Sequence, residues 1–187
     1  MCARNVYQVP ESFRYAPFYS TGTSFTCHDH YVDLEKKVKA EPFYFDMLYL
    51  VGEKLTEVPW EHSERSVPIV FKQWKELKPQ LQEGFTQRKS SKQNESALIH
   101  ALSLFIVCLF WTNETYVKGL HVKNMMISDL ILKPVNCEER LLFVINKPTQ
   151  YHSFVQLQQL FDEIEKIYHK GQAIKQMKHE KGITHIE

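Results

Sequence analysis

The longest run of apolar residues spans 97–111 and is interrupted only by His100 and Ser103. A helix of that length would rise about 22 Å, which is short of the roughly 30 Å hydrocarbon core of a membrane. Polar stretches bound the run closely, at residues 90–95 before it and 112–114 after it. The pattern therefore predicts a buried helix at the centre of a soluble protein and not a membrane span.

Two further helices are predicted before this run. The first begins near Pro42 and ends near Val58, because the residue before Pro59 avoids the α-helical conformation. The second begins with Ser66 as its N-cap residue, and Pro79 is expected to kink or break it. Their apolar stripes consist of Phe43, Met47, Leu50, Val51 and Leu55, and of Val67, Val70, Trp74, Leu77 and Leu81.

Two more helices are predicted after the run. Asn136 is expected to cap a helix over residues 137–145. The last helix begins near Thr149 or Ser153, and Gly171 is expected to end it. Its apolar residues form one continuous stripe, which consists of Phe154, Leu157, Leu160, Phe161, Ile164, Ile167 and Tyr168.

The connections between these helices are less regular. Residues 84–96 are polar and lead into the central helix, whose N-cap residue could be Ser91, Asn94 or Ser96. The stretch 116–132 is expected to be irregular or only briefly helical. Together, the patterns predict an all-α fold, an irregular helical bundle of about six helices around the central buried helix.

The two ends of the chain lack this helical periodicity. Residues 1–40 are predicted to form an irregular or partly disordered N-terminal arm, and residues 172–187 a basic polar tail. Between them lies a helical domain at 41–171. The arm is rich in aromatic side chains that could dock on the helical body, namely Phe13, Tyr15, Phe18 and Tyr19.

Composition narrows the class of protein. With 187 residues, of which 43% are hydrophobic, the chain can build one well-packed core, and its 6 glycines argue against a turn-rich β-sandwich. The formal net charge of +1 gives no overall attraction to nucleic acid or membranes. Four cysteines without a CxxC pair and the lack of a secretory signal favour a cytoplasmic protein with reduced thiols.

No enzymatic signature is present in the sequence. There is neither a G-x-S-x-G nucleophile motif nor a phosphate-binding glycine loop. Cys137 lies where a helix dipole could lower the pKa of its thiol, although an ordinary, partly buried cysteine is the favoured interpretation. We therefore expect no catalytic residue, no cofactor and a protein that is not an enzyme.

Metal binding is the third-ranked hypothesis. Cys27, His28, Asp29 and His30 are four adjacent potential ligands, but adjacent residues cannot all face one ion in regular structure. A surface cluster in a loop is the favoured interpretation, and no metal site is predicted. His100 in the central run is expected to be a hydrogen-bonded histidine of the core.

Nucleic-acid binding is the second-ranked hypothesis. Residues 65–92 carry seven basic and two acidic side chains, and such a basic face can bind phosphates. No recognition-helix motif or aromatic stacking platform accompanies it. The candidate contacts are Lys75, Lys78, Arg88, Lys89 and Lys92.

The leading hypothesis is a non-enzymatic protein-interaction or adapter module, whose partner is another protein. Trp60 and Glu61 lie in a predicted loop between two helices, and exposed tryptophan is enriched at binding hot spots. The alternative for Trp60 is a hydrophobic lid over the bundle. Trp74, on the apolar stripe of its helix, is expected to belong to the core.

A family resemblance supports the helical fold. Val58-Pro-Trp-Glu61 follows the first predicted helix, and Trp74 lies in the second. The segment Leu141-Leu-Phe-Val-Ile-Asn-Lys-Pro148 leads into Tyr151-His-Ser-Phe-Val-Gln-Leu-Gln-Gln-Leu-Phe161. With these motifs, the stretch from Phe43 to Lys170 resembles the YpoC-like family of small helical proteins from Gram-positive bacteria. That family has no established activity, so the resemblance implies a helical domain and no catalytic residue.

Overall fold

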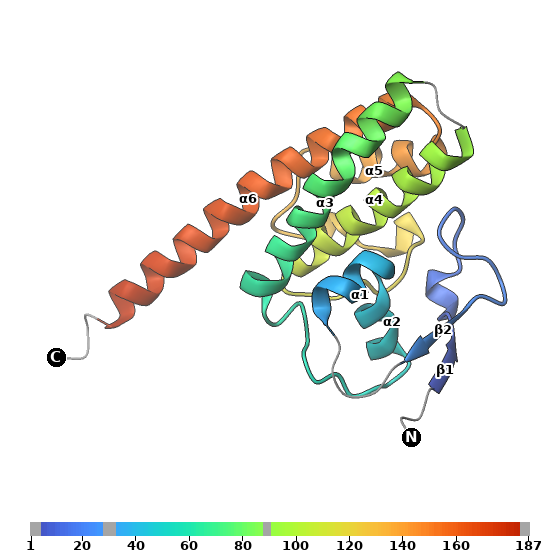
Figure 1. Ribbon diagram of the computed structural model, residues 1–187. Helices are drawn as coiled ribbons and strands as arrows, with labels where there is room; N and C mark the ends of the chain where they lie inside the picture. Colours follow the sequence, from blue (N-terminus) through green and yellow to red (C-terminus); the bar gives the residue numbers. More distant parts are fainter. Residues whose placement is uncertain (1–4, 28–32, 88–90, 184–187) are drawn as a thin grey trace.

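Helices make up most of the protein in the computed structural model, which describes residues 5–27, 33–87 and 91–183 (Figure 1). Within these ranges there are six α-helices, and the predicted all-α class is confirmed. They are α1 (Leu34–Ala40), α2 (Tyr44–Leu50), α3 (Ser63–Thr86), α4 (Ser91–Thr112), α5 (Cys137–Asn146) and α6 (Tyr151–Ile183). Short 3-10 helices lie at Glu11–Phe13, Val122–Asn124 and Ile127–Asp129, and β1 (Asn5–Gln8) pairs antiparallel with β2 (Ser24–Cys27).

Helix α4 forms the centre of the core, as its apolar run predicts. Every residue from 101 to 112 is buried, because α3, α5 and α6 pack around the helix. By length and hydropathy alone, the segment Lys92–Thr112 could cross a membrane, but 72% of its most apolar window is buried inside the protein. Burial by neighbouring helices is what a core helix requires.

None of the three residues predicted as the N-cap of α4 precedes the helix. The helix begins at Ser91, so Asn94 and Ser96 lie inside its first turns. Asn94 Nδ2 donates instead to the carbonyl of Gly84 in α3, at 3.1 Å. This bond links α3 to α4 close to the connection between them. Residues 84–86 and 91–96, which the sequence pattern places in that connection, are helical.

Helix α3 begins earlier than predicted and is not broken. It starts at Ser63, with His62 in the N-cap position, and continues past Pro79 to Thr86. Pro79 is exposed, and apolar contacts anchor the helix on both sides of it. Trp74 stacks on Phe161 of α6 with ring centroids 4.3 Å apart, and Leu81 is 1% exposed. This packing offsets the roughly 3 kcal/mol that an interior proline costs.

The predicted helix at 42–58 is much shorter, because α2 ends at Leu50. Gly52 has a φ of 82°, a left-handed conformation that suits glycine. Its N–H donates to the carbonyl of Tyr49, and the N–H of Glu53 donates to that of Leu48. These two bonds form a Schellman motif, which ends the helix. The helix therefore ends just before Gly52, and the prediction that Pro59 ends it was wrong.

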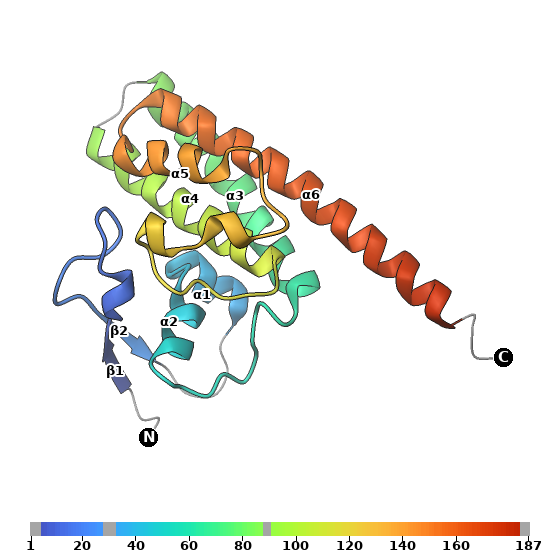
Figure 2. The same cartoon turned by 180° about the vertical axis from the view of Figure 1, so that it is seen from behind.

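Helix α6 continues beyond the glycine that was expected to stop it. Gly171 lies within the helix, which extends to Ile183 and projects away from the body in both views (Figures 1 and 2). An interior glycine costs only about 1 kcal/mol relative to alanine. Residues 172–178 are good helix formers and contain no proline, so the helix continues through Gly171. The predicted polar tail is helical as far as it is described.

The cap predicted for α5 is correct in position and wrong in mechanism. Asn136 occupies the N-cap position, but its φ is 52° and its side chain makes no capping hydrogen bond. The segment before α5 is irregular apart from its two 3-10 turns, as predicted.

The N-terminal arm packs on the body through its aromatic side chains. Phe13 is fully buried, and its ring meets that of Phe43 edge to face at a centroid distance of 5.5 Å. Phe18 and Tyr19 contact the same Phe43 ring. The docking that the sequence leaves open is present in the structure, and the described part of the predicted arm contains a small β-hairpin and helix α1 instead of being irregular throughout.

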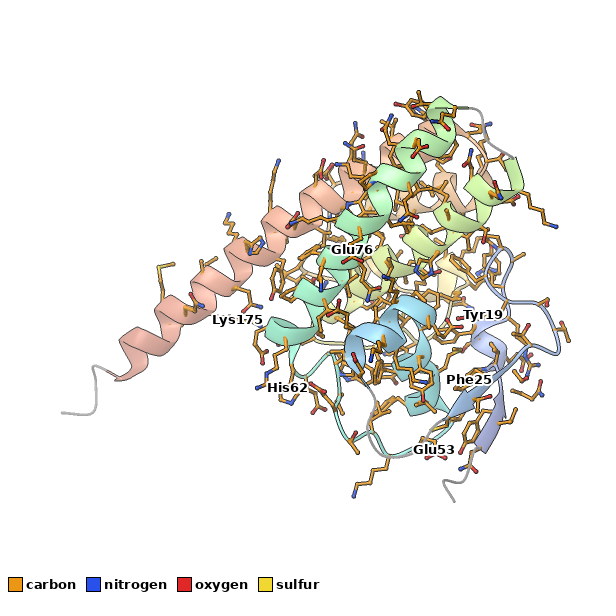
Figure 3. All side chains as sticks on the ribbon, in the orientation of Figure 1. Tyr19, Phe25, Glu53, His62, Glu76 and Lys175 are labelled. Atoms are coloured by element: carbon orange, nitrogen blue, oxygen red, sulfur yellow. The ribbon has the colours of Figure 1, made fainter. Side chains whose placement is uncertain are left out.

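Polar contacts hold the arm at several further points. The hydroxyl of Tyr7 donates to Glu53, and that of Tyr19 donates to Glu41. Figure 3 shows Tyr19, Phe25 and Glu53 at this end of the molecule. The N–H of Leu120 donates to the carbonyl of Ser12 at 2.9 Å, which joins the arm to the loop after α4.

Candidate functional site

Two lysines of the predicted basic face of α3 are paired with carboxylates. Lys75 forms an ion pair with Glu165 of α6 at 2.6 Å, and its neighbour Lys72 pairs with Glu35 of α1 at the same distance. Glu76, also on α3, pairs with Lys39 at 3.3 Å (Figure 3). The folded structure thus places acidic side chains from α1 and α6 on the face that sequence alone shows as basic.

The remaining candidate phosphate contacts differ in their exposure. Lys78 is half-buried on α3, and Lys92 is exposed in the first turn of α4. Arg88 and Lys89 lie outside the described residues. Among the described candidates, Lys75 and Lys78 are neighbours on one face of α3, where Lys75 is held in an ion pair.

Trp60 is buried, contrary to the exposure that a partner contact needs. Only 5% of the residue is exposed, and its ring lies 5.2 Å from that of Tyr49 and 5.4 Å from that of Tyr116. This is the hydrophobic lid that the alternative interpretation describes. Glu61, the other candidate, is exposed beside it.

The candidate metal ligands fall mainly outside the described residues. Cys27 is half-buried at the end of β2, and His28, Asp29 and His30 are not among the described positions. No group of three or more His, Cys, Asp or Glu side chains suited to an ion occurs within the described ranges. His100 is half-buried in α4, and burial lowers the pKa of its imidazole.

The thiol of Cys137 is not activated. The residue is 3% exposed, and burial raises its pKa to about 12, opposite to the lowering that a helix N-terminus would give. Cys108 is fully buried in α4, and burial raises the pKa of its thiol as well. Both cysteines therefore act as small apolar residues of the core.

The most perturbed carboxylate is Asp46, which the sequence did not reveal. It is fully buried on α2, where Oδ1 accepts from the backbone N–H of Val117 at 2.6 Å and from Trp111 Nε1 at 3.4 Å. No described residue bonds Oδ2. Burial raises the pKa of the carboxyl to about 7. The side chain joins α2, α4 and the following loop, and it lines none of the described clefts.

The most prominent exposed apolar region comes from residues 126–142. Within it, Ile131 is 90% exposed, Val135 76%, Met126 58% and Leu142 40%. We call these four side chains the 126–142 surface. It belongs to α5 and the segment before it, which lie toward the viewer in Figure 2. The four residues are close in sequence, and an exposed apolar patch marks an interaction site more often than scattered exposed residues do.

A cleft of about 410 Å³ lies within this region. Ile127 and Cys137, which are almost fully buried, form part of its lining, together with the partly exposed Leu142. Glu138 and Glu139 also line it and are exposed at the N-terminus of α5. Lys133 lines the cleft as well, so the cleft combines apolar walls with a rim of two acidic side chains and one basic one.

Hydrogen bonds hold the segment before α5 in place. The Asn113 side chain binds both backbone groups of Leu132: its Nδ2 donates to the carbonyl, and its Oδ1 accepts from the N–H, each at 2.8 Å. Lys133 Nζ donates to the carbonyl of Ser128 at 2.7 Å. Ile131 and its neighbours are therefore exposed on a fixed backbone.

Arg140 fastens the same region to α6. Its Nη1 donates to Glu163 at 2.9 Å and to the carbonyl of Val135 at 3.2 Å, and its Nε donates to Gln156 at 3.1 Å. The arginine thus fixes the position of the 126–142 surface relative to α6. No periodicity in the sequence pointed to this surface, because its apolar residues lie mostly in irregular structure.

Comparison with known proteins identifies the family. Residues 64–176 match the model of the YpoC-like protein family. The chain is also similar to the uncharacterised protein YpoC of Bacillus subtilis, with 33% identity over 142 residues, which cover 76% of this chain and 84% of that protein. No solved structure matches at a significant level. The chain therefore belongs to the YpoC-like family.

Proposed function

We propose that this member of the YpoC-like family is a non-enzymatic, cytoplasmic protein-interaction module that binds its partner through the 126–142 surface. The observation that carries the proposal is the exposure of Ile131 and Val135, at 90% and 76%, on a backbone fixed by hydrogen bonds. Burying such side chains against a partner stabilises a complex by roughly 25 cal/mol per Å² of apolar surface.

The chemistry of the surface indicates what it binds. The apolar side chains would form the centre of an interface, and Glu138 and Glu139 its polar rim. A suitable partner presents apolar side chains flanked by lysine or arginine. Because the segment is already ordered, little conformational entropy is lost on binding.

The alternative of nucleic-acid binding has less support. Lys75, one of its main candidates, is paired with Glu165, and the neighbouring Lys72 with Glu35. An exposed ion pair is weak, at about 0–1 kcal/mol, but its carboxylate also repels an approaching phosphate.

A capture experiment distinguishes these roles. The tagged protein is used to retain binding proteins from the cells in which it is made, with and without nuclease. We expect one protein to be retained in near-equal amount after nuclease and to be lost with Val135→Asp. The matched control is Val6→Asp on β1, where Val6 is 64% exposed. Recovery of nucleic acid, with all proteins lost after nuclease, would contradict the interaction role.

A further inference from the structure

The projecting end of α6 is the second unusual surface of the molecule. We call residues 172–183 of α6 the α6 tip; it extends about 18 Å beyond Gly171 at 1.5 Å per residue. Both views show it standing clear of the other helices (Figures 1 and 2). Ile174 and Met177 are three positions apart and hence neighbours on one side of the helix, and they are 40% and 51% exposed.

The charge of the α6 tip is opposite to that of the cleft rim. The sequence of the tip contains three lysines, Lys175, Lys178 and Lys181, and one acidic residue, Glu180. Lys170 and Lys178 are exposed, while Lys175 pairs with Glu114 where α6 leaves the body (Figure 3). The tip is therefore an apolar stripe flanked by lysines, which is the partner chemistry that the 126–142 surface requires.

We infer that the 126–142 surface binds the α6 tip of a second copy of this chain, so that the protein forms a two-fold symmetric dimer. The inference rests on the proposed function and names the occupant of its surface. Each copy carries one basic apolar tip and one acidic apolar cleft, so a two-fold axis lets both copies fill both surfaces at once.

The dimensions of α6 permit this arrangement. Gly171 lies beside Leu132, since a Cβ built on the glycine would lie 3.6 Å from Leu132 Cδ1. Glu163 lies about 12 Å before Gly171 along α6, and it accepts a hydrogen bond from Arg140 of α5. If two α6 helices run antiparallel and cross near Gly171, each tip passes along residues 163–171 of the other, at the edge of the 126–142 surface.

The test is the concentration dependence of the mass of the full chain, measured by sedimentation equilibrium. We expect a monomer–dimer equilibrium with twice the 22.2 kDa chain mass at high concentration. Met177→Glu and Val135→Asp should each raise the dissociation constant at least about 10-fold, as loss of a central apolar contact does. The matched control is Gln176→Glu, which adds the same charge on a different face of the tip.

Charge reversal tests the pairing of the two surfaces. Glu138→Lys with Glu139→Lys should weaken the dimer, and adding Lys170→Glu with Lys178→Glu should restore it. A chain that stays monomeric at all concentrations, or a dimer that Met177→Glu leaves intact, overturns the inference. A monomer whose Val135→Asp variant loses a captured host protein overturns only the second-copy occupant, and the proposed function stands. A monomer whose tip binds nucleic acid, with binding lost in Lys178→Glu, overturns it in favour of a phosphate partner.

Discussion

The N-terminal arm and the α6 tip both lie outside the helical core, yet the first is packed and the second is not. The arm buries Phe13 completely and surrounds Phe43 with three aromatic rings. The tip carries lysine and glutamine around two partly exposed apolar residues, Ile174 and Met177. Aromatic content, and not helical periodicity, determines which end of the chain belongs to the body.

The two ends of the chain therefore have different roles. An arm that buries large rings contributes to the stability of the single chain, and its removal should unfold or loosen the body. A tip that buries little has almost no effect on that stability, so its exposed apolar and basic side chains are available for a second molecule.

The largest expected effect comes from removing the anchor of the arm. Phe13→Ala should lower the free energy of unfolding by about 3–5 kcal/mol, because a fully buried ring is replaced by a cavity. Chemical denaturation at low protein concentration measures it. A loss below about 1 kcal/mol would show that the arm is not part of the core.

The second prediction concerns Asp46, on the helix that the arm covers. The pKa of this carboxyl is about 7 in the folded protein and about 4 in an unfolded chain. The folded state therefore binds this proton more tightly, and the contribution of Asp46 to stability is largest below pH 4. It falls as pH rises from about 4 to 7, by on the order of 4 kcal/mol, and is constant above pH 7.

Asp46→Asn removes this titration, since the amide mimics the neutral carboxyl and its oxygen can still accept from Val117. We expect the variant to be more stable than the wild type at pH 8 and equal to it near pH 4. Free energies of unfolding across pH 4–8 measure the difference. Glu41, whose pKa burial also raises, is present in both proteins and cancels. Identical slopes in the two proteins would mean that Asp46 is accessible to water.

A pair of glycine substitutions sharpens the contrast between the arm and α6. A Cβ at Gly119 would lie 2.8 Å from the carbonyl oxygen of Ser12, so Gly119→Ala should displace the arm and cost about 1–3 kcal/mol. A Cβ at Gly171 meets only Leu132 at an ordinary distance, so Gly171→Ala should stabilise the helix by up to about 1 kcal/mol. Thermal unfolding of both variants gives the sign directly. If both substitutions stabilised the protein, or both destabilised it, the expected contrast between the arm and α6 would be contradicted.

The smallest expected effect is at the tip itself. Met177→Ala should change the stability of the monomer by less than about 0.5 kcal/mol, as exposed substitutions usually do. Denaturation at low concentration, where a dimer is dissociated, measures this. A loss of 2 kcal/mol there would place the tip in the monomer's own core.

Much of the fold could be predicted because its helices bury long periodic stripes. The apolar run at 97–111 correctly predicted α4, and the apolar stripe from Phe154 to Tyr168 correctly predicted α6. Single punctuating residues predicted the boundaries poorly, because packing outweighed Pro79 and helix propensity outweighed Gly171. The β-hairpin of the arm was missed, since two four-residue strands carry almost no periodic signal.

The candidate site was harder to predict than the fold. Trp60 was a reasonable candidate from its loop position, but Tyr49 and Tyr116, distant from it in sequence, cover its ring. The exposure of Ile131 and Val135 depends on where α5 and α6 place an irregular segment. Such placement follows from tertiary contacts like those of Arg140, which no local pattern encodes.

Hydrogen exchange of the full chain at two concentrations tests the central claim most directly, because it observes the arm and the tip in one sample. We predict that the amides of the arm, including Phe13, are protected at both concentrations. The amides of the α6 tip should exchange fast at low concentration and become protected at high concentration. Tip amides that exchange at the same rate at both concentrations would contradict the account.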